Sequence, residues 1–191
     1  MAKPVQNPSA ALELAETYDI KGGLRLQLDE VIVPVQIVGP KLGPAAYALT
    51  VTAAVVGEQA LSHILCPPVL GALVNVYRII IRTAVATSGV IRVPTAAVSG
   101  LTGVTEQWQD RKRGGVPGAI VGQDTSAAPA AGVDVVGWAT AIGIPFVLDL
   151  DVVLIPATGT PNGDGNLMCL CSAANVAMDV TWLWREPPLD I

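Results

Sequence analysis

Charged side chains are scarce in this chain of 191 residues, at 14% of the sequence against about 25% in an average soluble domain. Basic residues are fewer than acidic ones, 11 against 16, which gives a formal net charge of −5. Proteins that bind nucleic acid neutralise its phosphates with clustered Lys and Arg. The one basic run is short, Arg111-Lys112-Arg113. The composition therefore argues against nucleic acid as a partner.

Long uninterrupted apolar runs are also missing, although 51% of the residues are hydrophobic. A membrane-spanning helix needs about 20 consecutive apolar residues, and residues 59–77 contain His63 and the pair Pro67-Pro68. The start of the chain lacks the apolar segment of a signal peptide. The sequence thus predicts no membrane partner, and we expect the protein to stay in the cytosol until it meets its partners.

Cysteine and histidine are too few to suggest a metal centre. The three cysteines, Cys66, Cys169 and Cys171, cannot all pair within one chain, so free buried thiols are expected. Cys169 and Cys171 would face the same side of a strand, but a structural zinc site needs four ligands. Cys66 and the single histidine, His63, lie far away in the sequence. We predict no metal and no cofactor.

Catalytic constellations are equally hard to assemble. Ser62 and His63 are neighbours, and neighbours on a strand point to opposite faces, so they cannot form the core of a triad. Asp149 and Asp151 share a strand face and could serve hydrolysis or bind a cation, but an outward polar face on an edge or interface strand explains them better. We predict no catalytic residues and no enzymatic activity.

The residues that are present favour pleated sheet. Aromatics make up only 4%, whereas Gly and Pro number 19 and 15, so the apolar content is mainly small and β-branched. Alternation and turn signals predict strands at 30–38, 48–56, 59–66, 73–85, 90–94, 134–140, 144–155, 166–172 and 176–185. A run of strands without helical crossovers indicates an all-β fold: a single antiparallel β-sandwich of jelly-roll type with an extended N-terminal arm.

The expected organisation is an arm over residues 1–28, with a short helix beginning near Ser9, followed by the sandwich over 29–191. Pro34 cannot donate a ladder hydrogen bond, which places its strand at a sheet edge or against another chain. Ser88-Gly89 is interpreted as a hairpin turn. The Gly-, Ala- and Pro-rich stretch 98–133 is too long for a plain connection and is predicted to project from the sandwich, with one or two short strands around 116–121.

Two sets of side chains are candidates for contact with partners. The alternation in 73–85 puts Arg78 and Arg82 on one face with Val74 and Val76, so both guanidinium groups should reach water or a partner. Trp182 and Trp184 alternate along the last strand. They are interpreted as core or subunit interface, and a sugar-stacking platform shared with Trp108 and Trp138 is the alternative.

Three segments resemble a broad group of tailed-bacteriophage virion proteins with jelly-roll folds. Leu28-Asp29-Glu30-Val31-Ile32-Val33-Pro34-Val35 is similar to the strand that follows their leading arm. Gly57-Glu58-Gln59 through Ser62-His63-Ile64-Leu65 is similar to their next strand, and Trp182-Leu183-Trp184-Arg185-Glu186 to their closing strand. The resemblance implies a structural part of a virus particle, most often a trimeric capsid decoration or cement protein.

The partners implied are further copies of the chain in a homotrimer and the major capsid protein or other virion proteins, with assembly in the host cytoplasm and residence in the virion. A phage tail, fibre or adaptor component, or a carbohydrate-binding β-sandwich module that engages a host-surface glycan, is the alternative. The candidate interface residues are Val31, Val33, Pro34, Val35, Arg78, Arg82, Arg111, Arg113, Trp182 and Trp184.

Overall fold

The computed structural model describes the strands at 24–28 and 31–35 and residues 43–53, 56–67, 70–95, 101–124, 131–155 and 165–188. The chain divides into two compact units, Met1–Lys41 and Leu42–Ile191. The division lies later than the expected boundary after residue 28. The expected helix near Ser9 lies outside the described residues.

The first unit contains an antiparallel pair of strands, β1 (Leu24–Leu28) and β2 (Val31–Val35). Both strands of a two-stranded sheet are edges, so Pro34, opposite Arg25 in the register, occupies a position that tolerates the missing N–H. The edge placement predicted for Pro34 is confirmed. The strand pairs with β1 and belongs to the first unit, however, and not to the sandwich.

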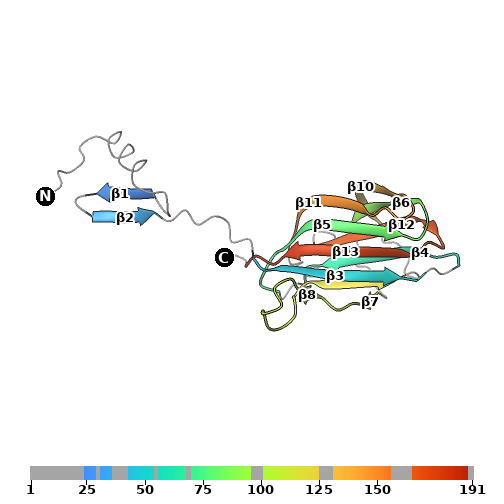
Figure 1. Ribbon diagram of the computed structural model, residues 1–191, viewed down its shortest axis with the longest axis horizontal. Coiled ribbons are helices and arrows are strands. Elements are labelled where there is room, and N and C mark those ends of the chain that lie inside the picture. Colours follow the sequence, from blue (N-terminus) through green and yellow to red (C-terminus); the bar gives the residue numbers. More distant parts are fainter. Residues whose placement is uncertain are drawn as a thin grey trace. The chain divides into compact units, whose positions relative to one another are not determined.

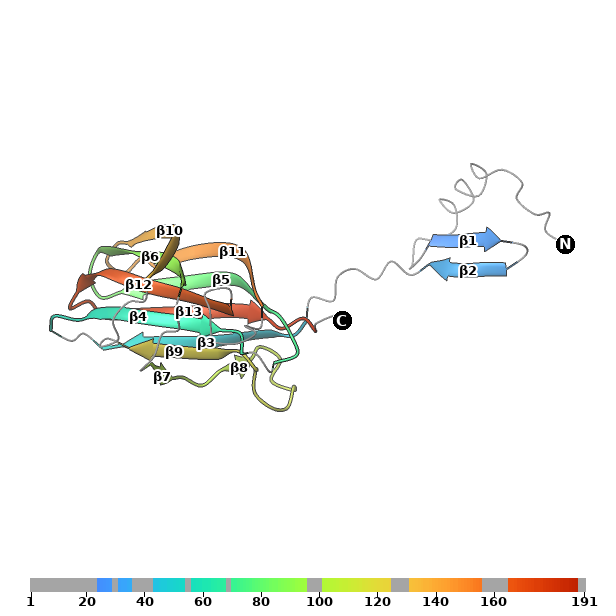
Figure 2. The ribbon, with the colours of Figure 1, turned by 180° about the vertical axis from the view of Figure 1, so that it is seen from behind.

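The second unit is built from two antiparallel sheets, seen from opposite sides in Figures 1 and 2. One has five strands in the order β11-β5-β13-β3-β8, and the other has six in the order β10-β6-β12-β4-β9-β7. Their bounds are β3 (Ala45–Thr52), β4 (Gln59–Leu65), β5 (Val74–Thr83), β6 (Thr87–Pro94), β7 (Thr102–Gly103), β8 (Gln107–Trp108), β9 (Ile120–Asp124), β10 (Gly132–Thr140), β11 (Phe146–Leu154), β12 (Asn166–Ala174) and β13 (Met178–Arg185).

The connectivity of the long strands is that of a jelly roll. From β3 to β6 and from β10 to β13, successive strands alternate between the two sheets, and β6 and β10 are neighbours in one sheet. This gives the four-strand cores β11-β5-β13-β3 and β10-β6-β12-β4, the double-sheet arrangement that closes two Greek keys on one core. The predicted fold class, an all-β antiparallel sandwich, is confirmed.

Alternation along each strand fills the space between the sheets. In β13 the residues Met178, Val180, Trp182 and Trp184 are buried while their neighbours are partly exposed, as predicted. The two indoles lie beside Ala48 and Ala46 on β3 in the register. Small side chains on one strand thus leave room for large ones on the next, which gives a close-packed interior.

A β-bulge in β5 changes which side chains face the core. Leu183 pairs with Arg78 and Trp184 with Val76, so Tyr77 is an extra residue on this strand. Val74 and Val76 are buried before the bulge, and Ile79 and Ile81 after it. The expected grouping of Val74 and Val76 with Arg78 and Arg82 on one face is therefore wrong, because strict alternation does not survive an inserted residue.

The interpretation of Ser88-Gly89 as a hairpin turn is also wrong. Both residues lie inside β6, which belongs to the sheet opposite β5. Gly89 is needed for close approach, since a Cβ at this position would lie 2.1 Å from the Leu170 carbonyl oxygen and 2.2 Å from the Trp138 ring. The missing side chain of Gly89 lets the Trp138 indole pack directly against the backbone.

The stretch expected to project from the sandwich is largely part of it. β9 pairs with β4, β7 with β9, and β8 with β3, so this insertion extends both sheets at one edge. Two carboxylates anchor it. Glu106 accepts a hydrogen bond from the Val121 N–H at 2.8 Å, and buried Glu186 accepts from the N–H groups of Gly118 and Ala119 at 2.9–3.1 Å. These carboxylates satisfy backbone N–H groups that would bind water if the segment projected into solvent.

Candidate functional site

The outer face of the five-stranded sheet carries a row of three apolar side chains and one threonine across four strands. In the register Val147 on β11 lies beside Ile80 on β5, Ile80 beside Thr181 on β13, and Thr181 beside Leu49 on β3. The side chains of Val147 and Leu49 are 50% and 49% exposed. We call Val147, Ile80, Thr181 and Leu49 the outer row. Apolar side chains aligned on an exposed sheet are typical of a surface that a partner covers.

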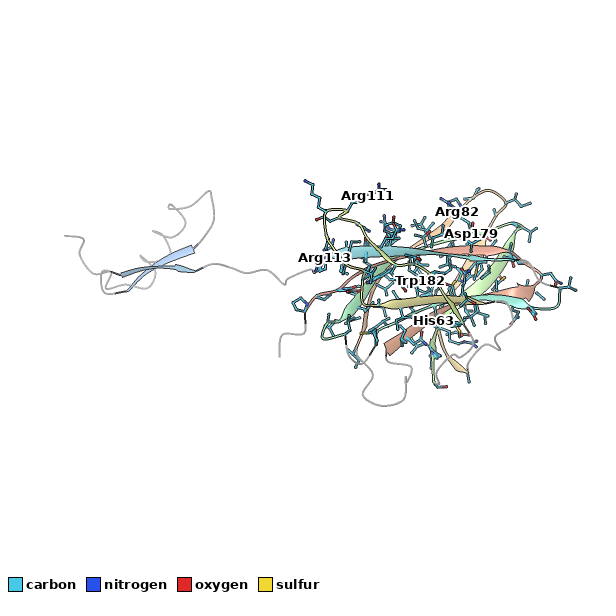
Figure 3. The ribbon with its side chains drawn as sticks, turned by 90° about the horizontal axis from the view of Figure 1, so that it is seen from below. His63, Arg82, Arg111, Arg113, Asp179 and Trp182 are labelled. Atoms are coloured by element: carbon cyan, nitrogen blue, oxygen red, sulfur yellow. The ribbon has the colours of Figure 1, made fainter. Side chains whose placement is uncertain are left out.

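Opposite charges lie on both sides of the outer row. On one side Arg78 donates to Asp149 at 2.5 Å, and this hydrogen bond holds the pKa of the Asp149 carboxyl below its usual value. On the other side Arg82 and Asp179 are cross-strand neighbours. No ion pair joins these two among the residues that the structure describes. Figure 3 shows both on the same side of the sandwich.

Next to this face, a polar cluster surrounds two tyrosines. Tyr47 donates its hydroxyl proton to Gln107 at 2.7 Å, and Gln109 donates to the Tyr77 hydroxyl at 2.7 Å. The Arg185 guanidinium lies 5.5 Å from the centre of the Tyr77 ring, a cation–π distance. These contacts tie β8 to the sheet and hold the side chains in place at the border of the exposed face.

The predicted basic run lies in the loop between β8 and β9. Arg111, Lys112 and Arg113 are exposed, and Figure 3 labels Arg111 and Arg113. The turn is held by Asp110, whose carboxylate accepts from the Lys112 N–H at 3.0 Å. The Arg113 guanidinium stacks 4.5 Å from the Trp108 ring. Arg111 and Arg113 are therefore available to a partner on a turn of defined shape.

Trp182 and Trp184 are fully buried within the sandwich and are therefore not interface residues. The Trp182 Nε1–H donates to the Ser62 hydroxyl at 2.7 Å, and Trp184 Nε1–H donates to Glu186 at 3.0 Å. Trp138 is 3% exposed. Three of the four tryptophans proposed for a sugar platform are thus in the interior, and the interpretation of Trp182 and Trp184 as core is the correct one.

His63 faces away from this core, on the other side of β4 from Ser62, in agreement with the sequence argument against a triad. It is 6% exposed and Nδ1 has no partner. Leu61 and Met168 form a small second cluster on this sheet, and Met168 is the register neighbour of His63. Burial lowers the pKa of His63 from 6.5 to about 4, so the imidazole is neutral near pH 7.

The cysteines are buried and free, as predicted. Cys169 and Cys171 both face the main core on β12, and burial raises the pKa of the Cys169 thiol, while burial and the Glu186 charge raise that of Cys66 to about 11. Such thiols are poor nucleophiles. Across the described part of the chain, His, Cys, Asp and Glu form no group of three that could hold a metal ion.

In the same described ranges, no helix is long and apolar enough to span a membrane.

Sequence reasoning found part of this surface and missed part of it. Arg78 and Arg82 are exposed on the five-stranded sheet, as expected, and Val31, Val33, Pro34 and Val35 form most of β2 in the other unit. Leu49 and Asp179 were not singled out. The signal was the order of sizes in β3, where Ala46 and Ala48 face the core and larger Tyr47, Leu49 and Val51 face outward.

Comparison with family models, with curated proteins and with solved structures finds no match to this chain.

Proposed function

We propose that the protein is a structural subunit of a bacteriophage virion that decorates and stabilises the capsid by non-covalent contacts. The observation that carries the proposal is the exposed outer row on a jelly-roll sandwich. Jelly rolls with this connectivity build viral capsid proteins as well as lectins and cupins. Lasting interfaces are more apolar than free surfaces, so the low charge and the outer row favour an assembly subunit.

The proposed assembly is a homotrimer that attaches to the shell through its N-terminal segment. The trimer follows from the resemblance to virion proteins. The attachment rests on β1 and β2, which form a two-stranded sheet in a unit separate from the sandwich. Edge strands offer unpaired N–H and C=O groups that a partner sheet can extend. A tail or adaptor subunit would use the same surfaces in another part of the particle.

A carbohydrate-binding module is the less favoured function. Stacking on sugars needs exposed aromatic faces, and Trp182, Trp184 and Trp138 are buried. The partly exposed Tyr47 and Tyr77 are engaged with Gln107, Gln109 and Arg185. A glycan-binding screen of the isolated protein tests this alternative, since a lectin-like module binds without a shell.

Shell binding and its dependence on the N-terminal segment test the proposal. Purified protein should co-sediment with capsid shells prepared without it, at a fixed ratio to the shell protein. Deletion of residues 1–41, which removes β1 and β2, should leave the oligomer intact by light scattering and abolish co-sedimentation. Replacement of exposed Val116, which is not a candidate interface residue, by Ala is the control and should leave binding intact. A truncated protein that still decorates shells would refute attachment through this segment, and a monomer would refute the trimer.

A further inference from the structure

The charges beside the outer row are arranged so that this face is complementary to itself. Arg82 on β5 and Asp179 on β13 face each other in the register, on the two middle strands of the four-strand core β11-β5-β13-β3. A two-fold axis that lies in the contact plane, parallel to the strands and between β5 and β13, exchanges the positions of the two strands. Arg82 of one copy then faces Asp179 of the other, and the reverse pair forms at the same time.

The same axis brings the outer row against its own copy. Val147 on β11 faces Leu49 on β3 of the second copy, and Ile80 on β5 faces Thr181 on β13. Sheets that pack face to face lie about 10 Å apart with strands aligned to within about 30°, and their side chains interdigitate. The half-exposed Val147 and Leu49 would be covered by this contact. Arg78 faces Leu183 of the second copy across this contact and pairs with Asp149 in its own chain.

We propose that the outer face of the five-stranded sheet is an isologous interface, in which a second copy of this chain docks with reciprocal Arg82–Asp179 pairs beside the apolar outer row. An isologous contact uses the same patch on both partners, and the complementary charges fix its register and orientation. The contact is independent of the trimer: alone it gives a dimer, and with a trimer it joins each subunit to one in a neighbouring trimer.

Charge-reversal variants separate this contact from the pairing of the two residues within one chain. Arg82→Asp gives a face with two acidic groups, and Asp179→Arg gives a face with two basic groups. Each variant alone opposes like charges across the two-fold axis and should dissociate. In a mixture, every acidic group of one variant faces a basic group of the other. The mixture should therefore recover association, and all of it should be between unlike variants.

The experiment is sedimentation of full-length protein, with one variant fluorescently labelled to count unlike pairs. We expect at least a tenfold weaker self-association for each single variant, and recovery to near the wild-type constant in the equimolar mixture. Circular dichroism checks that each variant is folded, and Leu49→Asp offers a second disruption in the outer row. The control pair is Arg92→Asp with Asp134→Arg, because Arg92 and Asp134 form a cross-strand pair on the other sheet.

Association of the control variants should match the wild type. Three outcomes would overturn the proposal: single variants that associate as the wild type does, a mixture that remains dissociated, or control variants that dissociate as the test variants do. None of these measurements uses a virus particle. The isologous contact can therefore hold if the protein is not a virion subunit, and the protein can be a virion subunit if the contact does not form.

Discussion

Removing the hydroxyl of Ser62 should destabilise the sandwich, because this hydroxyl accepts a hydrogen bond from the indole of Trp182. Trp182 is fully buried on β13, and its Nε1–H donates across the core to Ser62 on β4 at 2.7 Å. Ser62→Ala removes this acceptor while leaving the donor buried, which costs about 1–3 kcal/mol. Thr50, which donates to Ser62 at 2.9 Å, retains the Val180 carbonyl at 3.2 Å as an acceptor, so its loss adds little.

A double-mutant cycle isolates the pair. Trp182→Phe removes the donor together with part of the ring, and should cost less than the about 3–5 kcal/mol of truncation to Ala. In the Trp182→Phe background, Ser62→Ala leaves no orphaned indole and should be nearly neutral. The coupling free energy between the two sites should thus be about 1–3 kcal/mol. Urea unfolding followed by far-ultraviolet circular dichroism measures all four proteins.

The control cycle replaces Ser62→Ala by Thr52→Val. Thr52 is also buried and bonds the Met178 backbone, not the indole. The loss of unfolding free energy caused by Thr52→Val should simply add to that caused by Trp182→Phe, since the effects of separated sites with no shared partner are additive to about 0.5 kcal/mol. Additive costs in the Ser62 cycle would refute the inference that this hydrogen bond joins the two sheets.

Three further changes test other parts of the structure. Gly89→Ala should lower the melting temperature strongly, because its Cβ would meet backbone and the Trp138 ring, whereas Gly103→Ala has open space and should melt like the wild type. Glu186→Gln should cost about 1–3 kcal/mol and speed proteolysis of the loop between β8 and β9, since the amide places an NH2 group where Oε2 accepts from the Gly118 N–H and removes the charge that strengthens the hydrogen bonds to Oε1; equal cleavage would contradict this. Between pH 6.5 and about 4 the unfolded chain binds a proton at His63 that the folded chain does not, so stability should fall by about 3 kcal/mol over this interval; His63→Leu should lose that part of the pH dependence, and identical pH profiles would show that the imidazole charges freely in the folded state.

The sequence predicted those strands whose two faces differ throughout their length. β13 alternates without interruption between buried and partly exposed side chains, and β11 alternates between exposed residues, among them both aspartates, and less exposed apolar ones. In β5 the pattern is broken by the extra residue at Tyr77. A bulge is fixed by the strands on either side, and a single strand read alone carries no sign of it.

The short strand expected around 116–121 overlaps β9, but β7 and β8 were not predicted, for a similar reason. β7 and β8 are two residues each, too short to show any period. β8 forms on β3 and β7 forms on β9, which is itself held by hydrogen bonds from Ala119 and Val121 to the carboxylates of Glu186 and Glu106. The outer row was missed because cross-strand register sets which residues lie side by side. Arg82 and Asp179, far apart in sequence, become neighbours only through that register.

The composition of purified virus particles tests the central proposal most directly. Particles from lysates of cells that carry this gene, banded on a density gradient, should contain this chain at a constant ratio to the major shell protein, as quantified by mass spectrometry. Antibody raised against residues 42–191 should label intact particles in electron micrographs. A chain that stays at the top of the gradient, with none in the particle band, would contradict the assignment as a virion subunit.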